Sequence, residues 1–350
     1  MKREVDLSLI SSFFIPRTTL VGMHAAQAIP DRLEQLGGQK PLIVTDQGIV
    51  KTGILKQITD ILDDHGMKYE VYDGTVPNPT TRNVNEATAV YKEKGCDSLI
   101  SLGGGSSHDC CKGVGLLISN GGKIQDYEGI DKSTKRFPPY VAVNTTAGTA
   151  SEMTRFCIIT DTRRKVKMAI VDWRVTPQIA INDPELMKGM PPALTAATGM
   201  DALTHAVEAY LGRFYPTRET NRLAEQAVVT IFQTLEHACA HGDDVAARQA
   251  LLTASYQAGF AFTRAGVGNV HAIAHTLGGL YGIPHGLACA VTLPVVLEDY
   301  GAAVHPHLAR LGSLIGLTGT ERERAVGFLA AIRALNASLG IPDRFDGIRG

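Results

Sequence analysis

The hydrophobic pattern of the chain changes near residue 185, and this change limits the folds open to it. Before that point, short β-branched runs alternate with amphipathic helical stretches, whereas from about residue 191 the pattern is helical and rich in alanine. Strands that alternate with helices favour a parallel sheet covered on both faces. We therefore expect an α/β domain with a parallel sheet over residues 1–188 and an all-helical domain over residues 189–350.

Local patterns predict where the elements of the first domain lie. The expected strands are Pro41–Thr45, Tyr69–Tyr72, Ser98–Leu102 and Tyr140–Asn144, and the expected helices between them include Ile54–His65 and Asn83–Lys94. Proline is tolerated in the first turn of a helix. The pair Pro191-Pro192 is therefore expected to begin the first helix of the second domain.

Composition excludes several classes of protein. Of the 350 residues, 44% are hydrophobic and 20% are charged, which is typical of a globular protein with a large core. The net charge is -1 and basic residues do not cluster, so we expect neither nucleic acid nor an anionic membrane as a partner. No apolar run suits a signal peptide or a membrane span, and the six cysteines form no CxxC pair. These features predict a cytoplasmic protein with reduced thiols.

The second domain contains a pattern of candidate metal ligands. Asp201 and His205 stand four residues apart in a helical stretch, His271 and His275 repeat that spacing, and His285 follows shortly after. This spacing places two side chains on one helix face, and a carboxylate with several imidazoles suits a divalent metal. A single buried histidine is more often a packed, hydrogen-bonded core residue. Burying all of these groups is costly unless they are paired or bind an ion.

The first domain contains a glycine-rich turn between an expected strand and an expected helix. In Gly103-Gly104-Gly105-Ser106, glycines let backbone N–H groups approach a phosphate, and the helix N-terminus attracts negative charge. The turn is not the GxGxxG fingerprint, and it is also compatible with an ordinary turn. Residues 144–149 form a similar loop. Asp46 ends the first clear strand. It could bind ribose hydroxyls there and favour NAD over NADP, or it could cap the helix that follows.

At these residues the sequence resembles the iron-containing (group III) alcohol dehydrogenases, over essentially the whole chain. The stretch 166–174 further resembles the branch that contains NAD-dependent methanol and 1,3-propanediol dehydrogenases. The resemblance implies a Rossmann-like nucleotide-binding domain, an all-helical metal-binding domain and a cleft between them, the architecture that dehydroquinate synthases share. The segments that carry the resemblance are residues 77–80, 103–109, 145–149, 190–194, 199–210 and 271–286.

The resemblance also implies roles for individual residues. It makes Asp201, His205, His271 and His285 ligands of Fe(II), with zinc or another divalent metal as alternatives, and it places His275 beside the metal as a proton relay. It places Phe262 in the substrate pocket. Arg264 lies nearby, either to attract an acidic or hydroxylated substrate or as a rim residue without a role. The implied NAD contacts are Asp46, Asn78, Gly104, Gly105, Ser106, Asp109, Thr145, Thr146, Thr149 and Lys167.

The expected activity is hydride transfer between NAD and a small primary alcohol or diol, which is converted to the aldehyde or formed from it. A bound metal would polarise the alcohol or carbonyl oxygen. A hydroxy-acid or polyol dehydrogenase, a dehydroquinate synthase-like lyase and a non-catalytic binder remain as alternatives. Those lyases usually carry Glu where Asp201 stands.

Relatives form dimers or larger assemblies, so we expect a homo-oligomer. They also continue for a few tens of residues beyond the position of Gly350, so we expect a truncated or naturally shortened C-terminus.

Overall fold

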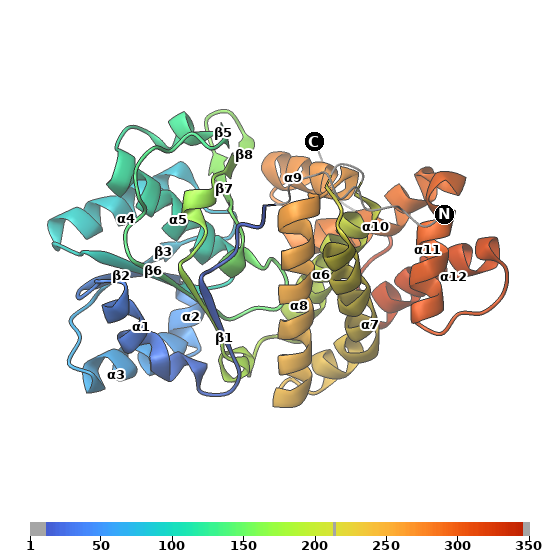
Figure 1. Ribbon diagram of the computed structural model, residues 1–350, viewed down its shortest axis with the longest axis horizontal. Coiled ribbons are helices and arrows are strands. Elements are labelled where there is room, and N and C mark those ends of the chain that lie inside the picture. Colours follow the sequence, from blue (N-terminus) through green and yellow to red (C-terminus); the bar gives the residue numbers. More distant parts are fainter. Residues whose placement is uncertain (1–11, 213–214, 346–350) are drawn as a thin grey trace. The chain divides into compact units, whose positions relative to one another are not determined.

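The computed structural model of the protein describes residues 12–212 and 215–345, which form two compact units (Figure 1). The first unit contains residues 14–146 and 151–189. The second contains the chain from Met190 onward, together with residues 12–13 and the short segment Ala147–Ala150. This segment was expected to belong with the α/β domain. It groups with the helical unit because Gly148 packs so tightly on Thr198 that an added Cβ would lie 2.7 Å from the Thr198 Cβ.

A six-stranded sheet forms the centre of the first unit, and every pair of neighbouring strands is parallel. The predicted parallel sheet is thus confirmed, and the four predicted strands correspond to four of its six strands. The two remaining strands, Thr18–Val21 and Ile179–Asn182, were not predicted. In spatial order the strands are β1 (Thr18–Val21), β9 (Ile179–Asn182), β6 (Tyr140–Asn144), β4 (Ser98–Gly103), β2 (Pro41–Asp46) and β3 (Glu70–Thr75).

Helices cover both faces of this sheet, and alternate strand residues form two separate cores. Ile43 and Val141 belong to the core shared with α1 and α3, whereas Leu42 and Tyr140 belong to the core shared with α4 and α5. This division follows from the two-residue period of a strand, which sends neighbouring side chains to opposite faces. The helices are α1 (Ile29–Gln35), α2 (Gln47–Lys51), α3 (Ile54–Asp64), α4 (Thr81–Glu93) and α5 (Gly105–Asn120).

A small second sheet completes the first unit. Strands β7 (Phe156–Asp161) and β8 (Val166–Val171) pair antiparallel, and the short strand β5 (Gly129–Ile130) adds to β8. Strand β7 also contacts α5, because the backbone N–H of Ile158 donates a hydrogen bond of 3.1 Å to the carboxylate of Asp109. Strand β7 therefore connects the second sheet to α5, the helix that follows the glycine-rich turn.

The second unit is helical, and its described residues from Met190 to residue 345 contain no strand, as predicted. Helix α6 packs against α7, α8 and α10, and every residue from Gly199 to Ala209 is buried. Gly199 permits this packing, because a Cβ there would lie 2.3 Å from Leu235 Cδ1 of α7. The helices are α6 (Pro192–Leu211), α7 (Arg218–Ala240), α8 (Val245–Ala265), α9 (Asn269–Tyr281), α10 (His285–Asp299), α11 (His305–Leu314) and α12 (Glu321–Ser338).

Within the described ranges, no single helix is both long enough and apolar enough to cross a bilayer. One bent pair, α10 with the segment Gly301–Leu314, meets the length and composition test when the two are taken together, with an angle of 105° between them.

Candidate metal centre and nucleotide-binding loops

Helix α6 places three ionisable side chains in the interior of the helical unit. Asp201, His205 and Glu208 follow the i, i+4, i+7 spacing that puts side chains on one face of a helix. Their exposed fractions are 1%, 5% and 6%. Because unpaired ionisable groups are costly to bury, their position requires specific partners.

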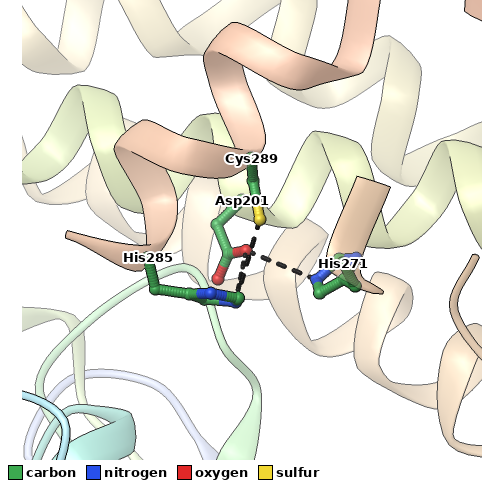
Figure 2. A group of neighbouring side chains, drawn as sticks. All are labelled: Asp201, His271, His285 and Cys289. Atoms are coloured by element: carbon green, nitrogen blue, oxygen red, sulfur yellow. Dashed lines mark hydrogen bonds and ion pairs between the residues drawn. The ribbon is translucent and has the colours of Figure 1, made fainter. Parts of the chain in front are cut away.

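Helices α9 and α10 bring two more histidines to Asp201 (Figure 2). The Asp201 Oδ1 atom lies 3.7 Å from His271 Nε2 and 3.5 Å from His285 Nε2. The other carboxylate oxygen lies 4.0 Å from His205 Nδ1, and the His205 ring stacks on that of His271 with centroids 4.4 Å apart. The structure thus brings together the four side chains that the sequence analysis named as metal ligands.

Three donor atoms of this group lack a hydrogen-bond partner. Asp201 Oδ1, His205 Nδ1 and His271 Nε2 are buried and have no hydrogen-bond partner among the described residues. Nitrogen and oxygen ligands bonded to a zinc-like cation at about 2.0–2.2 Å lie about 3.3–3.6 Å apart at tetrahedral angles. The observed separations of 3.5 and 3.7 Å are close to that range, and the separation of 4.0 Å from Asp201 to His205 is longer. The donor set therefore fits a divalent cation.

Asp201 and His205 have charge states that suit cation binding, whereas the pKa of His271 is raised, because its contacts with Cys289, Asp201 and Glu208 outweigh its burial. Burial raises the pKa of Asp201, but the nearby His205, His285 and His271 outweigh burial and hold this pKa well below its usual range. Burial lowers the pKa of His205 to about 4. At neutral pH the site therefore presents an ionised carboxylate and a neutral His205 imidazole, which are the protonation states that bind metals.

Glu208 is a functional residue that the sequence analysis missed. Its Oε2 atom lies 2.6 Å from His271 Nδ1, and its Oε1 accepts a hydrogen bond of 2.7 Å from the backbone N–H of Val270. Burial raises the pKa of Glu208, but its contacts with His271 outweigh burial and lower it. An ionised carboxylate on Nδ1 leaves Nε2 of the same ring directed at the cation site. The i+7 spacing from Asp201 was the signal that could have revealed Glu208.

Cys289 is a second residue that the analysis missed. It lies one turn after His285 on α10, and its Sγ belongs to a group of donor atoms, from Asp201, His271, His285 and Cys289, that all lie within 4.8 Å of one another (Figure 2). The i+4 spacing from His285 was the available signal.

Two further predicted site residues lie beside this group. The half-buried His275 has its ring centroid 5.2 Å from that of His285 and 6.1 Å from that of His271. The Phe262 ring stacks on His205 with centroids 4.1 Å apart. Both side chains are therefore next to the candidate ligands.

Arg264 lies in the last turn of α8 and contacts an aromatic ring. Its guanidinium lies over the ring of Tyr215, 5.0 Å from the ring centroid. This is a cation–π contact on the end of α8, which gives the side chain a packing role within the helical unit.

In the α/β unit, three adjacent strands bring the predicted nucleotide-binding loops to one sheet edge. Strands β6, β4 and β2 are neighbours and parallel, so their carboxyl ends meet where ligands bind in such folds. The backbone N–H of Thr145 donates to the Gly103 carbonyl at 3.0 Å. An added Cβ at Gly104 would lie 2.9 Å from Thr146 Cγ2. Helix α5 then begins at Gly105, with its free N–H groups at this edge.

Asp46 performs the capping role that the sequence analysis left open. Its Oδ1 accepts hydrogen bonds from the backbone N–H groups of Gly48 and Ile49 at 2.8 and 3.1 Å. Its Oδ2 accepts a 3.2 Å hydrogen bond from the Ser107 hydroxyl. The carboxylate therefore joins the end of β2 to the first turn of α5, at the edge where Gly104, Gly105 and Ser106 lie.

Asp109 makes contacts inside the unit. Its carboxylate accepts hydrogen bonds from the Ser151 hydroxyl at 2.7 Å and from the Ile158 backbone N–H at 3.1 Å, and it lies 3.9 Å from Lys112 Nζ. Burial raises the pKa of this carboxyl group. The side chain therefore connects α5 to Ser151 and to β7.

The remaining predicted NAD contacts are dispersed. Asn78 has a positive φ of 57°, and its carbonyl accepts from the Thr160 hydroxyl at 3.4 Å. Lys167 is half-buried on β8. Thr149 lies in the segment that groups with the helical unit, so the structure does not place it in the same unit as the other loops.

Comparison with known proteins identifies the relationship that this arrangement suggests. The family model described as iron-containing alcohol dehydrogenase matches residues 16–184, and the model for the C-terminal part of the same family matches residues 195–348. The chain belongs to the iron-containing alcohol dehydrogenase family. The predicted resemblance is confirmed, and with it the assignment of the chain to a family of oxidoreductases.

Individual relatives agree along most of their length. Alcohol dehydrogenase 4 of Schizosaccharomyces pombe is 45% identical over 326 residues, which cover 93% of this chain and 77% of the relative. The NAD-dependent methanol dehydrogenase of Bacillus methanolicus is 40% identical, with 96% and 89% covered. A crystal structure of 1,3-propanediol oxidoreductase superposes with a TM-score of 0.92 at 43% identity, with 95% and 88% covered.

Proposed function

We propose that this protein is a metal-dependent, NAD-linked alcohol dehydrogenase that interconverts a small primary alcohol or diol and its aldehyde. The observation that carries the proposal is the convergence of donor atoms from Asp201, His205, His271 and His285, several of which are buried without hydrogen-bond partners. The names of two relatives, a methanol dehydrogenase and a 1,3-propanediol oxidoreductase, support the substrate class.

In this proposal Asp201, His205, His271 and His285 hold the cation, and the family name supports Fe(II), with zinc or another divalent ion as the alternative. When bound, the cation lowers the pKa of an alcohol hydroxyl as a Lewis acid, and NAD supplies the hydride acceptor. Glu208 fixes the orientation of the His271 ring through the contact of 2.6 Å.

His275 carries the alcohol proton away from the site. The side chain is half-buried, next to His285 and more exposed than His271, so it connects the candidate site to solvent. Histidine is the side chain whose ordinary pKa suits proton transfer near neutral pH. Phe262 supplies an apolar wall beside His205 that excludes water from a small substrate.

NAD binds at the carboxyl edge of the parallel sheet. The backbone N–H groups of Gly104, Gly105 and Ser106 and the first turn of α5 receive the pyrophosphate. Asp46 receives the ribose hydroxyls and disfavours a 2′-phosphate. Asn78, Asp109, Thr145, Thr146, Thr149 and Lys167 complete the proposed set of cofactor contacts.

The proposed domain roles follow these sites, with NAD binding in residues 1–188 and cation binding in residues 189–350. We further propose that the protein is cytoplasmic, which its free thiols support, and that it forms a homodimer or a larger homo-oligomer. Light scattering during size-exclusion chromatography tests the assembly, and a mass equal to one chain contradicts it.

The function is tested by reconstituting the protein anaerobically with Fe(II) and following NADH absorbance with NAD and a panel of substrates. The panel contains methanol, ethanol, 1-butanol, 1,3-propanediol, a polyol and 4-hydroxybutyrate. Sustained NADH formation from small alcohols supports the proposal. A preference for the polyol or the hydroxy acid would show that the enzyme is a dehydrogenase of that substrate class instead. Absence of net NADH, with metal and NAD both bound, would contradict a dehydrogenase and favour a lyase or a binding protein.

A further inference from the structure

A thiol lies among the candidate metal ligands and has no role in the function proposed above. Cys289 follows His285 by one helical turn on α10, and its Sγ lies 3.8 Å from His285 Nε2. The donor atoms of Asp201, His271, His285 and Cys289 all lie within 4.8 Å of one another (Figure 2). The side chain is fully buried.

An independent observation indicates that a ligand belongs in this group. Asp201 Oδ1 and His271 Nε2 have no hydrogen-bond partner among the described residues, and their side chains are only 2% and 3% exposed. Both atoms face the space that the Cys289 sulfur also borders. The thiol is therefore part of the wall of a polar site and not simply a small apolar core residue.

The separations match a four-donor cation site that includes sulfur. At tetrahedral angles, sulfur at about 2.3 Å and nitrogen at about 2.0–2.1 Å from zinc lie about 3.6 Å apart. The distance from Cys289 Sγ to His285 Nε2 is 3.8 Å, and those from Asp201 Oδ1 to the two histidines are 3.5 and 3.7 Å. His205 approaches the other carboxylate oxygen of Asp201, at 4.0 Å. His205 and Cys289 thus both lie near the Asp201 carboxylate.

We propose that Cys289 is an additional metal ligand and that it shifts the preference of this site from Fe(II) toward zinc. The inference rests on the proposed metal site and specifies its cation. Thiolate is a soft ligand that selects zinc, whereas a site of imidazoles and one carboxylate accepts ferrous iron and zinc alike. On binding, a bond forms between Sγ and the cation, the S–H bond breaks and its proton passes to solvent, with no change of oxidation state.

Cobalt(II) is the direct probe, because a bound thiolate gives a sulfur-to-cobalt charge-transfer band in the near ultraviolet. The full chain is loaded with cobalt(II), and its spectrum is compared with those of Cys289→Ser, which keeps the size of the side chain, and Cys289→Ala. The matched control is Cys239→Ala, a half-buried thiol on α7. We expect the band in the unchanged chain and in the control, and its loss in both Cys289 variants.

Metal competition provides the second measurement. The anaerobic protein is offered equal amounts of zinc and ferrous iron, and the bound metals are quantified. We expect the bound ratio of zinc to iron to fall about tenfold or more in both Cys289 variants, as for loss of a metal-site contact. Bound cobalt without the charge-transfer band, or an unchanged ratio, overturns the role of Cys289 and leaves the metal site intact. Failure of the unchanged chain to bind any divalent metal overturns the proposed function as well.

Discussion

At the scale of single residues, the candidate metal centre depends on side chains that orient other side chains. Glu208 contacts the ring nitrogen of His271 that faces away from Asp201, and the same carboxylate accepts from the backbone at Val270. One residue of α6 therefore fixes both the ring and the first turn of α9. Such partners of ligands affect metal binding although they do not touch the metal.

Replacing Glu208 with Gln removes the charge and keeps the size of the side chain. We expect metal affinity to fall about 10- to 100-fold, because the His271 ring loses its charged acceptor. Competition with a chelator measures the affinity. Glu225→Gln is the control, since that carboxylate pairs with Arg310 on the surface of the helical unit. Equal affinities in the two variants would show that Glu208 has only a structural role.

Replacing His275 with Ala tests the proton relay. We expect turnover to fall about 100-fold or more, because a positioned general base typically contributes that much. Metal content should stay at the level of the unchanged chain, since the His275 ring lies beside the donor group. Elemental analysis and NADH kinetics on the same sample separate the two effects. Loss of metal together with activity would make His275 a ligand.

The sequence alone identified the candidate ligands but not all members of the site. The four-residue spacings of Asp201 with His205 and of His271 with His275 were visible in the sequence. The packing of α6, α9 and α10 determines which nitrogen atoms converge. This packing cannot be predicted from local sequence patterns. Cys289 was missed because a thiol on an apolar helix normally indicates core packing.

At the scale of elements, close helix packing positions the ligands. The backbone of α10 at Gly286 approaches α6 so closely that an added Cβ would lie 2.4 Å from the Ala197 carbonyl oxygen. Because the obstacle is backbone, it cannot move aside as a flexible side chain would. The residue next to His285 therefore has to be glycine for α10 to lie where it does.

Replacing Gly286 with Ala should displace the start of α10 and His285 with it. We expect a loss of stability of about 1–3 kcal/mol, as for overpacking of a core, and weaker metal binding. Thermal unfolding and a metal titration measure the two effects. Val295→Ala, at a position on the same helix that is 55% exposed, is the control. If Gly286→Ala keeps the metal affinity of the control, the close approach does not position His285.

Most elements of the sheet domain were predictable from the sequence because their patterns are local. The predicted strand Tyr140–Asn144 agrees fully with β6, and the predicted helix Ile54–His65 differs from α3 by one residue. Strands β1 and β9 were missed because their sequences show no clear alternation of apolar and polar residues. Their place in the sheet is determined by pairing with each other and with β6.

At the scale of the whole molecule, the change of pattern near residue 185 was sufficient to predict an α/β unit followed by a helical unit. The grouping of Ala147–Ala150 with the helices was not predictable, because it depends on the contact of Gly148 with Thr198.

The stability of the α/β unit is expected to depend on pH, because the unit buries the carboxyl group of Glu152. This carboxyl group is only 1% exposed and contacts Asn182.

Burial raises the pKa of Glu152 to about 7 from an ordinary value of 4.5. The folded state thus binds this proton more tightly than the unfolded state, so the associated stability is complete below pH 4.5 and is lost as the pH rises through about 7. We expect Glu152→Gln to gain up to about 3 kcal/mol relative to the unchanged chain between pH 4.5 and 8. Unfolding midpoints at several pH values measure the difference, and a constant difference would contradict the raised pKa.

Metal-dependent alcohol oxidation is tested by titrating the metal-loaded protein with a chelator while measuring bound metal and the rate of NADH formation from 1,3-propanediol in the same samples. We expect the rate to fall in proportion to bound metal and to return when a divalent metal is restored, and we expect Asp201→Asn neither to retain metal nor to form NADH. Full activity in metal-free protein, or in Asp201→Asn, would show that the Asp201 site does not support the reaction.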